Sequence, residues 1–346
     1  MMCSGGDKYS TIDLGLFSKY RTELMGIATV LIILCHMPAH GVYMPLWIKN
    51  IIVHGGSGCD MFLFLSGLAM YHSYSNNNSQ GKSLLTWLLT WLYRRYLRIF
   101  VPYLIIAVPC LSVDLFIGNI TFGRFLLRLS TISFWIDGKA LWFLALLLIL
   151  YLITPILFYL KKCQKQWPII LFALMAWSFG FIVGLEGPAK HIQFGLCRTP
   201  CYLVGFIMAD YILTGKRVKL RYTFLPLVFT LVICVIINKL TSIQITYFWI
   251  EGMVLLFVFV LIIRRFSHTS KLCRCLSFMG VISLESYCTN VLLLSFFLCF
   301  SYTFYGINLN EGNWAYYIVG SIFCVIVSLI VNRLSKWILS LIIANQ

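Results

Sequence analysis

The chain has 346 residues, of which 60% are hydrophobic, 16% are aromatic and only 11% are charged. An ordinary soluble domain is about 45–50% apolar and about 25% charged, so this composition excludes a water-soluble enzyme, a coiled coil and a disordered chain. The net charge of +16 comes from 27 basic and 11 acidic residues. Because the basic residues lie in short clusters between long apolar runs, we interpret them as signals of membrane orientation and expect no nucleic acid partner.

Ten apolar segments of roughly twenty residues follow one another along the chain, and each is long enough to predict a transmembrane helix. They lie near residues 22–42, 52–74, 99–118, 141–160, 167–185, 199–214, 223–240, 247–263, 277–303 and 315–335. We therefore predict an all-α polytopic membrane bundle of about ten helices. Residues 22–335 would form this transmembrane domain, between an N-terminal segment 1–21 and a C-terminal tail 336–346.

The segments that join these helices differ in their content of basic residues. With ten spans, 20 Lys and Arg residues fall on the side of the two termini and 7 fall on the opposite side. Cytoplasmic loops carry the excess of basic residues in membrane proteins, so both termini are predicted to be cytoplasmic. In the long outer segment 119–140, apolar residues recur every three to four positions around Arg124 and Arg128. This spacing predicts an amphipathic helix on the outer surface.

A few polar side chains lie inside the predicted spans, where they are costly and commonly functional. His36 lies about two thirds of the way across the first span from the cytoplasm, and Asn290 lies at a similar depth in the ninth. Asp60 enters the second span from outside, so these three groups can share one layer. A structural interpretation stays open: His36 and Glu285 can each bond a neighbouring helix, and Asp60 can cap backbone groups at the membrane boundary.

Six motifs, in order along the chain, resemble those of the acyltransferase-3 family of bacterial membrane O-acyltransferases. They are residues 23–28 with His36, residues 58–67, residues 94–103, residues 141–144 with Tyr151 and Pro155, residues 198–200 with Gly205, and the Ser-Leu-Glu-Ser-Tyr sequence at 283–287. Together they extend over most of the chain.

Two positions depart from the pattern of that family. Met25 stands eleven positions before His36, where the family usually has Arg, and Asn290 stands where it often has His. Asn keeps a hydrogen-bond donor and acceptor but cannot carry a proton near neutral pH. Arg21 lies one helical turn before Met25, and its side chain can reach a similar place.

The resemblance implies transfer of an acyl group, expected to be acetyl, from cytoplasmic acyl-CoA to a hydroxyl of an extracytoplasmic or lipid-linked glycan at a bacterial cell membrane. It implies His36 as the general base or acyl carrier, in a catalytic site with Asn290. Asp60 or Glu285 would orient the imidazole and stabilise its charged form. The residues expected to hold acyl-CoA are Arg21, Arg94, Arg95 and Arg98. Those expected on the acceptor side are Arg198 and Trp142. Acyl-CoA would be a co-substrate, and neither a metal nor a permanently bound cofactor is expected.

Two other classes of function stay open. A transporter or flippase for a polar or lipid-linked solute could use the buried acids and His36 for proton coupling. A scaffolding member of the family without activity is suggested by Met25 and Asn290. Binding or consumption of acetyl-CoA distinguishes the enzyme from the transporter.

Overall fold

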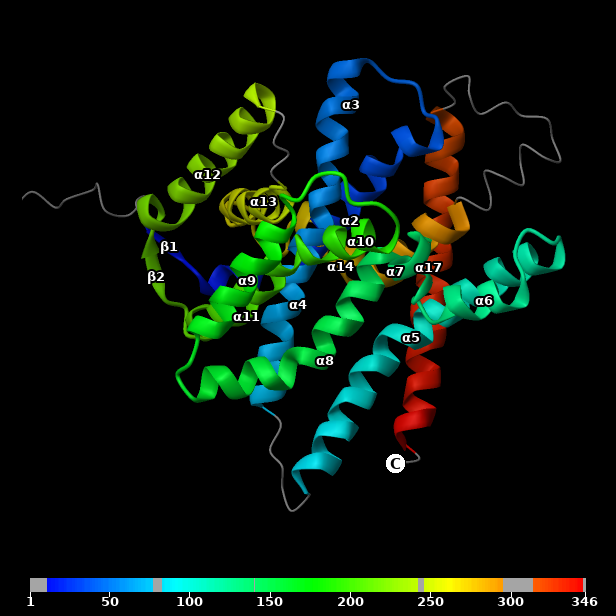
Figure 1. Ribbon diagram of the computed structural model, residues 1–346, viewed down its shortest axis with the longest axis horizontal. Coiled ribbons are helices and arrows are strands. Elements are labelled where there is room, and N and C mark those ends of the chain that lie inside the picture. Colours follow the sequence, from blue (N-terminus) through cyan, green and yellow to red (C-terminus); the bar gives the residue numbers. More distant parts are fainter. Residues whose placement is uncertain (1–10, 77–82, 140, 242–245, 295–313, 345–346) are drawn as a thin grey trace, which may run out of the picture. The chain divides into compact units, whose positions relative to one another are not determined.

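The computed structural model describes residues 11–76, 83–139, 141–241, 246–294 and 314–344. These residues are almost entirely helical (Figure 1). The strands β1 (Thr11–Asp13) and β2 (Arg217–Lys219) form one short antiparallel pair, in which Ile12 faces Val218. The prediction of an all-α membrane bundle is confirmed, and the chain is a multi-pass membrane protein.

Seven helical segments in the described residues are long and apolar enough to cross a membrane. They are Arg21–His40, Leu46–Ser75, Leu85–Phe116, Trp142–Lys162, Gly187–Leu213, Leu220–Leu240 and Trp314–Ile342. An eighth candidate, the pair Lys271–Val281 and Ser283–Leu293, is bent by 68° at its break.

Two of the predicted spans correspond to shorter helices, α9 (Trp167–Phe179) and α13 (Phe248–Ile263). The 13 residues of α9 rise by only roughly 20 Å, whereas the hydrocarbon core of a bilayer is about 30 Å thick. Within the described residues each of the ten predicted segments contains a helix, but these helices differ in their capacity to cross a membrane. The total of ten crossings and the cytoplasmic position of the termini stay predictions.

The chain divides into two compact units, each assembled from three segments. The first unit comprises residues 1–28, 57–78 and 153–280, and the second comprises residues 29–56, 79–152 and 281–346. The division falls inside α2 (Arg21–His36) and inside α8 (Trp142–Lys162).

The first unit holds β1, β2, the beginning of α2, the end of α8, α9 and α13. Its other helices are α1 (Gly15–Lys19), α4 (Gly58–Ser75), α10 (Gly187–Leu196), α11 (Thr199–Leu213), α12 (Leu220–Leu240) and α14 (Lys271–Val281). The second unit holds the end of α2 and the beginning of α8. Its other elements are η1 (Pro38–His40), α3 (Leu46–Val53), η2 (His54–Ser57), α5 (Leu84–Phe116), α6 (Phe122–Leu129), α7 (Ser133–Asp137), α15 (Ser283–Cys288), η3 (Thr289–Leu293) and α17 (Trp314–Ala344).

Helix α4 lies in the interior of the first unit, where it crosses α11 through two reciprocal glycines (Figure 1). A Cβ atom on Gly67 of α4 would lie 2.1 Å from the carbonyl oxygen of Tyr202. A Cβ atom on Gly205 of α11 would lie 2.2 Å from the carbonyl oxygen of Phe64. Small residues of this kind let helices approach backbone to backbone in a membrane. Residues 58–65 of α4 are consequently buried on every side, which explains a sequence that is apolar all round.

Replacing Gly205 by Ala is expected to destabilise the protein by about 1–3 kcal/mol, because the new methyl group meets rigid backbone. The measurement is thermal unfolding of the purified protein in detergent. Gly123→Ala in α6 is the matched control, because a Cβ there meets nothing within 4 Å. Equal melting temperatures for the two variants would contradict the close crossing.

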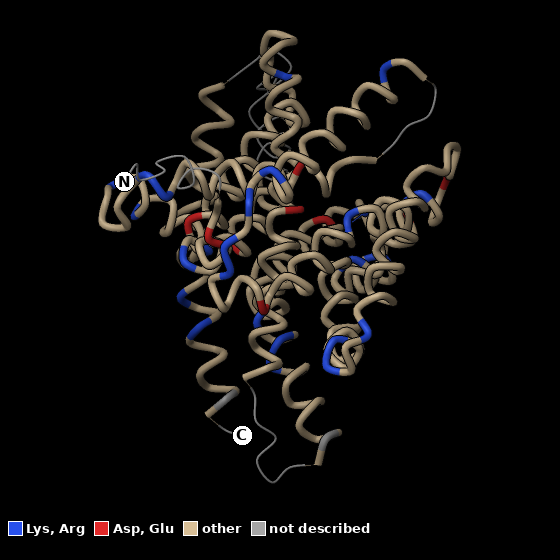
Figure 2. The backbone as a smooth tube through the Cα atoms, turned by 90° about the vertical axis from the view of Figure 1, so that its left-hand side faces the viewer, with Lys and Arg blue, Asp and Glu red and all other residues tan. Residues whose placement is uncertain are grey.

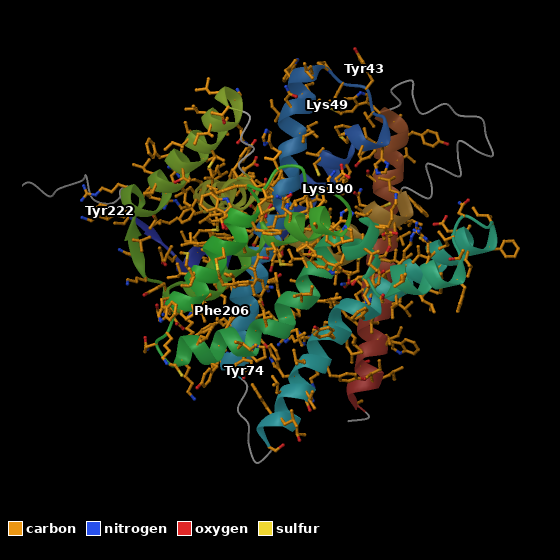
Figure 3. All side chains as sticks on the ribbon, viewed as in Figure 1. Tyr43, Lys49, Tyr74, Lys190, Phe206 and Tyr222 are labelled. Carbon is orange, nitrogen blue, oxygen red and sulfur yellow. The ribbon has the colours of Figure 1, made fainter. Side chains whose placement is uncertain are left out.

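A buried lysine joins three helices of the first unit. The ammonium of Lys161, at the end of α8, donates to the carbonyl oxygens of Phe206 and Ile207 at 3.0 and 2.9 Å. It also lies 3.0 Å from the Asp210 carboxylate and 3.8 Å from the centre of the Tyr71 ring. Figure 3 shows Phe206 within this packed region. These contacts together offset the cost of removing the ammonium from water, so a lysine whose side chain is only 5% exposed is tolerated here.

In the second unit, two tyrosines of α5 fix neighbouring segments by side-chain hydrogen bonds. The hydroxyl of Tyr96 donates to the carbonyl of Leu148 in α8, and that of Tyr103 donates to the carbonyl of Arg128 in α6, both at 2.7 Å. Helix α17 also packs along α5 and α15 in this unit. Helix α5 is thereby held against three separate parts of the sequence.

The predicted outer helix is two short helices, α6 and α7, because the backbone turns at Thr131 with a positive φ of 63°. Arg124 pairs with Asp137 at 2.9 Å, and Arg128 lies 3.7 Å from Asp114. Basic positions clearly outnumber acidic ones along the chain (Figure 2), but in this segment each arginine has an acidic neighbour. The apolar side chains of Phe122 and Leu126 are exposed, as an interfacial helix requires.

Candidate active site

The predicted catalytic histidine, His36, is the last residue of α2 and is half-buried in the second unit. A compact turn follows it. Pro38 begins η1, Gly41 adopts a left-handed conformation with a φ of 76°, and the amide of Val42 donates back to the carbonyl of Met37. Only glycine adopts such a φ readily. The turn places the ring of His40 at 6.5 Å from the ring of His36, measured between centroids.

Asn290 lies in η3, a π-helical turn over Thr289–Leu293 that continues α15 after the bend of the ninth predicted span. Such turns are rare, and many occur at functional sites. The hydroxyl of Thr289 bonds the carbonyl of Glu285 at 3.0 Å and the hydroxyl of Ser328 in α17 at 2.8 Å. These bonds satisfy polar groups that an irregular helix leaves open inside a membrane.

The structure brings His36 and Asn290 together, with Nδ1 of the imidazole 2.5 Å from Oδ1 of the amide. An amide oxygen can only accept, so Nδ1 carries the proton and donates it, and Nε2 is the basic nitrogen of the ring. Asn290 is 1% exposed. The amide therefore fixes both the tautomer and the orientation of the imidazole, as a carboxylate does in other catalytic histidine pairs.

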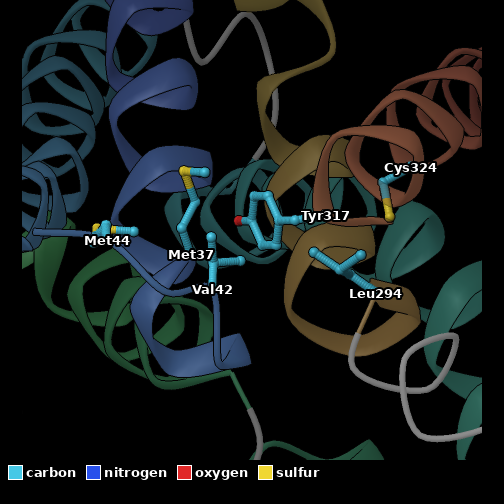
Figure 4. Packing of buried hydrophobic residues seen from close by; sticks show 6 residues of the cluster. All are labelled: Met37, Val42, Met44, Leu294, Tyr317 and Cys324. Carbon is cyan, nitrogen blue, oxygen red and sulfur yellow. The ribbon is translucent and has the colours of Figure 1, made fainter. Parts of the chain in front are cut away.

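Tyr317 of α17 completes the apolar side of this site. Its hydroxyl is close to the amide of Asn290 and donates to the carbonyl of Ile33 in α2. Its ring belongs to a buried cluster with Met37, Val42, Met44, Leu294 and Cys324 (Figure 4). The cluster packs α17 against the turn after α2 and excludes water from this side of the site.

The motif residues Glu285 and Tyr287 make structural contacts in the same unit. Oε1 of Glu285 accepts from Nδ2 of Asn332 in α17 at 2.9 Å. The ring of Tyr287 packs edge-on against Phe143, with centroids 5.3 Å apart, and Phe143 packs against the predicted acceptor-side residue Trp142 at 6.0 Å. Two motifs that are far apart in the sequence therefore meet.

Asp60 and Arg198 form a buried ion pair in the first unit, with NH1 2.5 Å from Oδ2 and side-chain exposures of 5% for the arginine and 0% for the aspartate. The guanidinium lies between the rings of Phe248 and Phe194, at 4.3 and 4.9 Å from their centroids. Helix α13 closes over the pair at Gly252, where a Cβ would lie 2.5 Å from Cβ of Asp60. The pair thus joins α4, α11 and α13.

The two acids that were predicted to orient His36 consequently have other hydrogen-bond partners, Arg198 for Asp60 and Asn332 for Glu285. Within the described residues, His36 donates its side-chain hydrogen bond to Asn290 instead. Any catalytic contribution of the two carboxylates stays a prediction.

The predicted acyl-CoA ligands lie on two helices. Arg94, Arg95 and Arg98 belong to α5 in the second unit, and Arg94 and Arg98 are exposed one turn apart on the same helix face. Within the described residues neither of these two arginines has a carboxylate partner. Arg21 begins α2 in the first unit and is half-buried, four residues before Met25.

Sequence reasoning missed two features that the structure reveals. His40 lies four residues after His36, and this spacing could have indicated a second imidazole in the site had the intervening Pro38 not suggested a helix end. Glu23 and His268 pair at 3.0 Å and join segments 245 positions apart, and the ring of His268 stacks on that of Tyr20 at 4.2 Å. No local pattern in a sequence predicts such a contact.

The fold is that of a helical membrane protein in which His36, at the end of an apolar helix, is bonded to an amide on a bent helix pair. The family model described as an acyltransferase domain matches residues 24–333. The chain therefore belongs to the acyltransferase-3 family and is a membrane acyltransferase. No curated protein and no solved structure matches it significantly.

Proposed function

We propose that the protein transfers an acyl group, expected to be acetyl, from cytoplasmic acyl-CoA to a hydroxyl of an extracytoplasmic or lipid-linked glycan in a bacterial cell membrane. The hydrogen bond between His36 Nδ1 and Asn290 Oδ1 carries this proposal, because it leaves a basic Nε2 on an oriented imidazole. A hydroxyl is a weak nucleophile until a base removes its proton, and a fixed histidine is the usual protein group for this step.

In this mechanism Nε2 of His36 takes the proton of the acceptor hydroxyl while its oxygen attacks the thioester carbonyl carbon. The carbon–sulfur bond then breaks, and the imidazolium returns the proton to the departing thiolate. The products are an ester and free CoA, and His36 ends in its original state. Asn290 takes no proton in this sequence; as a hydrogen-bond acceptor it stabilises the imidazolium that forms. This role requires only an acceptor, so Asn at a position where the family often has His is compatible with activity.

The arginines of α5 are the proposed ligands of the CoA phosphates, with Arg21 as a further candidate. Arg94 and Arg98 are exposed and have no carboxylate partner within the described residues. Such guanidinium groups suit phosphate, which accepts two parallel hydrogen bonds from one arginine. Trp142 and Arg198 stay the proposed acceptor-side residues, although the ion pair with Asp60 gives Arg198 a structural role as well.

Changing Arg94 and Arg98 together to Gln is expected to weaken acyl-CoA binding about tenfold or more, because two charge-assisted bonds to phosphate are lost. The measurement is calorimetric titration of acetyl-CoA at two salt concentrations, and the wild-type affinity should fall with added salt. The double change Arg264→Gln with Arg265→Gln removes the same charge elsewhere on the predicted cytoplasmic side and serves as control. Equal binding by both double variants would reduce the α5 arginines to membrane anchors.

The direct test of the proposed function uses the purified wild-type protein in liposomes with acetyl-CoA and an isolated bacterial surface glycan. We expect release of free CoA thiol that depends on the glycan, together with an ester on the glycan. A transporter or flippase would move solute and release no thiol. Absence of thiol release across a range of hydroxyl acceptors would contradict the proposal.

A further inference from the structure

His40 takes no part in the proton transfers of the proposed mechanism, yet the structure holds it beside the proposed base, His36. The turn from Met37 to Val42 is closed by the left-handed Gly41 and by the bond from the Val42 amide to the Met37 carbonyl. The ring of His40 lies 5.8 Å from the ring of Tyr317 and 6.5 Å from the ring of His36, between centroids. These contacts place the second imidazole beside the first.

The two imidazoles have ring nitrogens to offer a ligand. Asn290 occupies Nδ1 of His36, and within the described residues neither Nε2 of His36 nor either nitrogen of His40 has a hydrogen-bond partner. His40 is half-buried, whereas Tyr43, three residues further on, is 76% exposed and projects from the edge of its unit (Figure 3). The ring of Tyr317 lies 5.8 Å from that of His40, so the buried Tyr317 cluster borders the site beside His40.

The distance between the rings suits the two oxygens of an acyl transfer. The attacking oxygen must lie one hydrogen bond from the base, and the carbonyl oxygen, on which negative charge develops, must lie one hydrogen bond from a donor. Two hydrogen bonds of about 2.8 Å each, to two oxygens on one carbon, can join nitrogens up to roughly 8 Å apart. Rings whose centroids are 6.5 Å apart lie within that reach. A neutral imidazole is an effective donor to such an oxygen.

We propose that His40 donates a ring N–H to the carbonyl oxygen of the acyl group and stabilises the oxyanion, while His36 acts as the base. The inference rests on the proposed acyltransferase function. In the addition step the hydroxyl proton passes to His36 and the thioester carbonyl becomes an oxyanion bonded to His40. In the collapse step the carbonyl reforms, the carbon–sulfur bond breaks, and the proton goes from His36 to the thiolate. The proton on His40 stays on His40 throughout.

A competing role for His40 is that of a proton relay between His36 and the aqueous phase. The two roles differ in one chemical requirement. An oxyanion donor needs an N–H that stays in place, which the amide of glutamine also supplies. A relay needs a group that takes up and releases protons, which glutamine cannot do.

The test compares His40→Gln with His40→Phe, by steady-state kinetics of thiol release from acetyl-CoA in liposomes at varied acceptor concentration. We expect His40→Phe to lower kcat by about 10²–10³-fold with little change in KM for the acceptor, since a lost oxyanion donor acts in the transition state. The kcat of His40→Gln should be at least tenfold higher than that of His40→Phe. His72→Phe, which changes an exposed histidine of α4 that bonds Asn76, should behave as wild type.

Thermal unfolding of each variant in detergent separates loss of catalysis from loss of folding. The variant Tyr317→Phe keeps the ring that supports His40 and removes only the tyrosine hydroxyl. A folded His40→Gln variant as inactive as a folded His40→Phe variant would overturn the donor role in favour of the relay. If the wild-type protein is active and His40→Phe is equally active, the inference is overturned and the proposed function stands. A wild-type protein without thiol release would overturn both.

Discussion

Replacing His36 by Gln is expected to lower acyl transfer by about 10²–10⁴-fold, because a positioned proton acceptor contributes rate enhancement of that order. Glutamine retains a polar side chain that can still bond Asn290, so insertion into the membrane and the yield of protein should stay near wild type. The measurement is thiol release from acetyl-CoA by the purified variant. Binding of acetyl-CoA, which the mechanism assigns to other residues, should be unchanged.

The matched control is His72→Gln in α4, because His72 is exposed and bonds only its neighbour Asn76 in the described residues. Retention of more than half of the wild-type turnover by His36→Gln would remove His36 from the catalytic role. In that event the bond to Asn290 would be a structural contact between helices.

Asp60→Asn is expected to destabilise the protein by about 3–5 kcal/mol, the cost of breaking a buried ion pair at one partner. The change takes away the carboxylate that neutralises a guanidinium whose side chain is only 5% exposed. The double change Asp60→Asn with Arg198→Gln should be less destabilising than Asp60→Asn alone, since no buried charge of this pair is then left without its partner. Thermal unfolding in detergent measures both variants against the wild-type protein.

Asp137→Asn provides the comparison at an exposed ion pair, where Arg124 is 60% and Asp137 is 29% exposed in their side chains. Exposed pairs contribute about 0–1 kcal/mol, so this change should be nearly silent. If Asp60→Asn proved as mild as Asp137→Asn, the Asp60–Arg198 pair would not be the element that joins α4, α11 and α13.

Much of the fold follows from the sequence because lipid imposes simple constraints. A run of about twenty apolar residues has few alternatives to a helix when every backbone group must be bonded internally. The helices α8 and α12 accordingly begin and end near the predicted limits, and α2 and α17 begin near them. The prediction is less complete for α9 and α13, which are too short to cross unaided, because composition reports apolarity and not the point where a helix ends.

The candidate site was predictable in part. His36 and Asn290 follow from polar side chains in apolar runs and from their similar predicted depth. The partner of Asp60 could not be predicted from the sequence, because Asp60 and Arg198 are 138 positions apart and meet only through the packing of α4 on α11. The π-helical turn that holds Asn290 also has no local signal, since it depends on bonds from Thr289 to Ser328 in a different helix.

Acyl transfer to a glycan through His36 can be tested by mass spectrometry of bacterial surface glycans. The glycans are compared between cells that produce the wild-type protein, cells that produce the His36→Gln variant at an equal membrane level, and cells with neither. We expect an ester-linked acyl group on the glycan only with the wild-type protein, and its removal by mild alkali. The same glycan with and without the wild-type protein, or equal acylation by the His36→Gln variant, would contradict acyl transfer through His36.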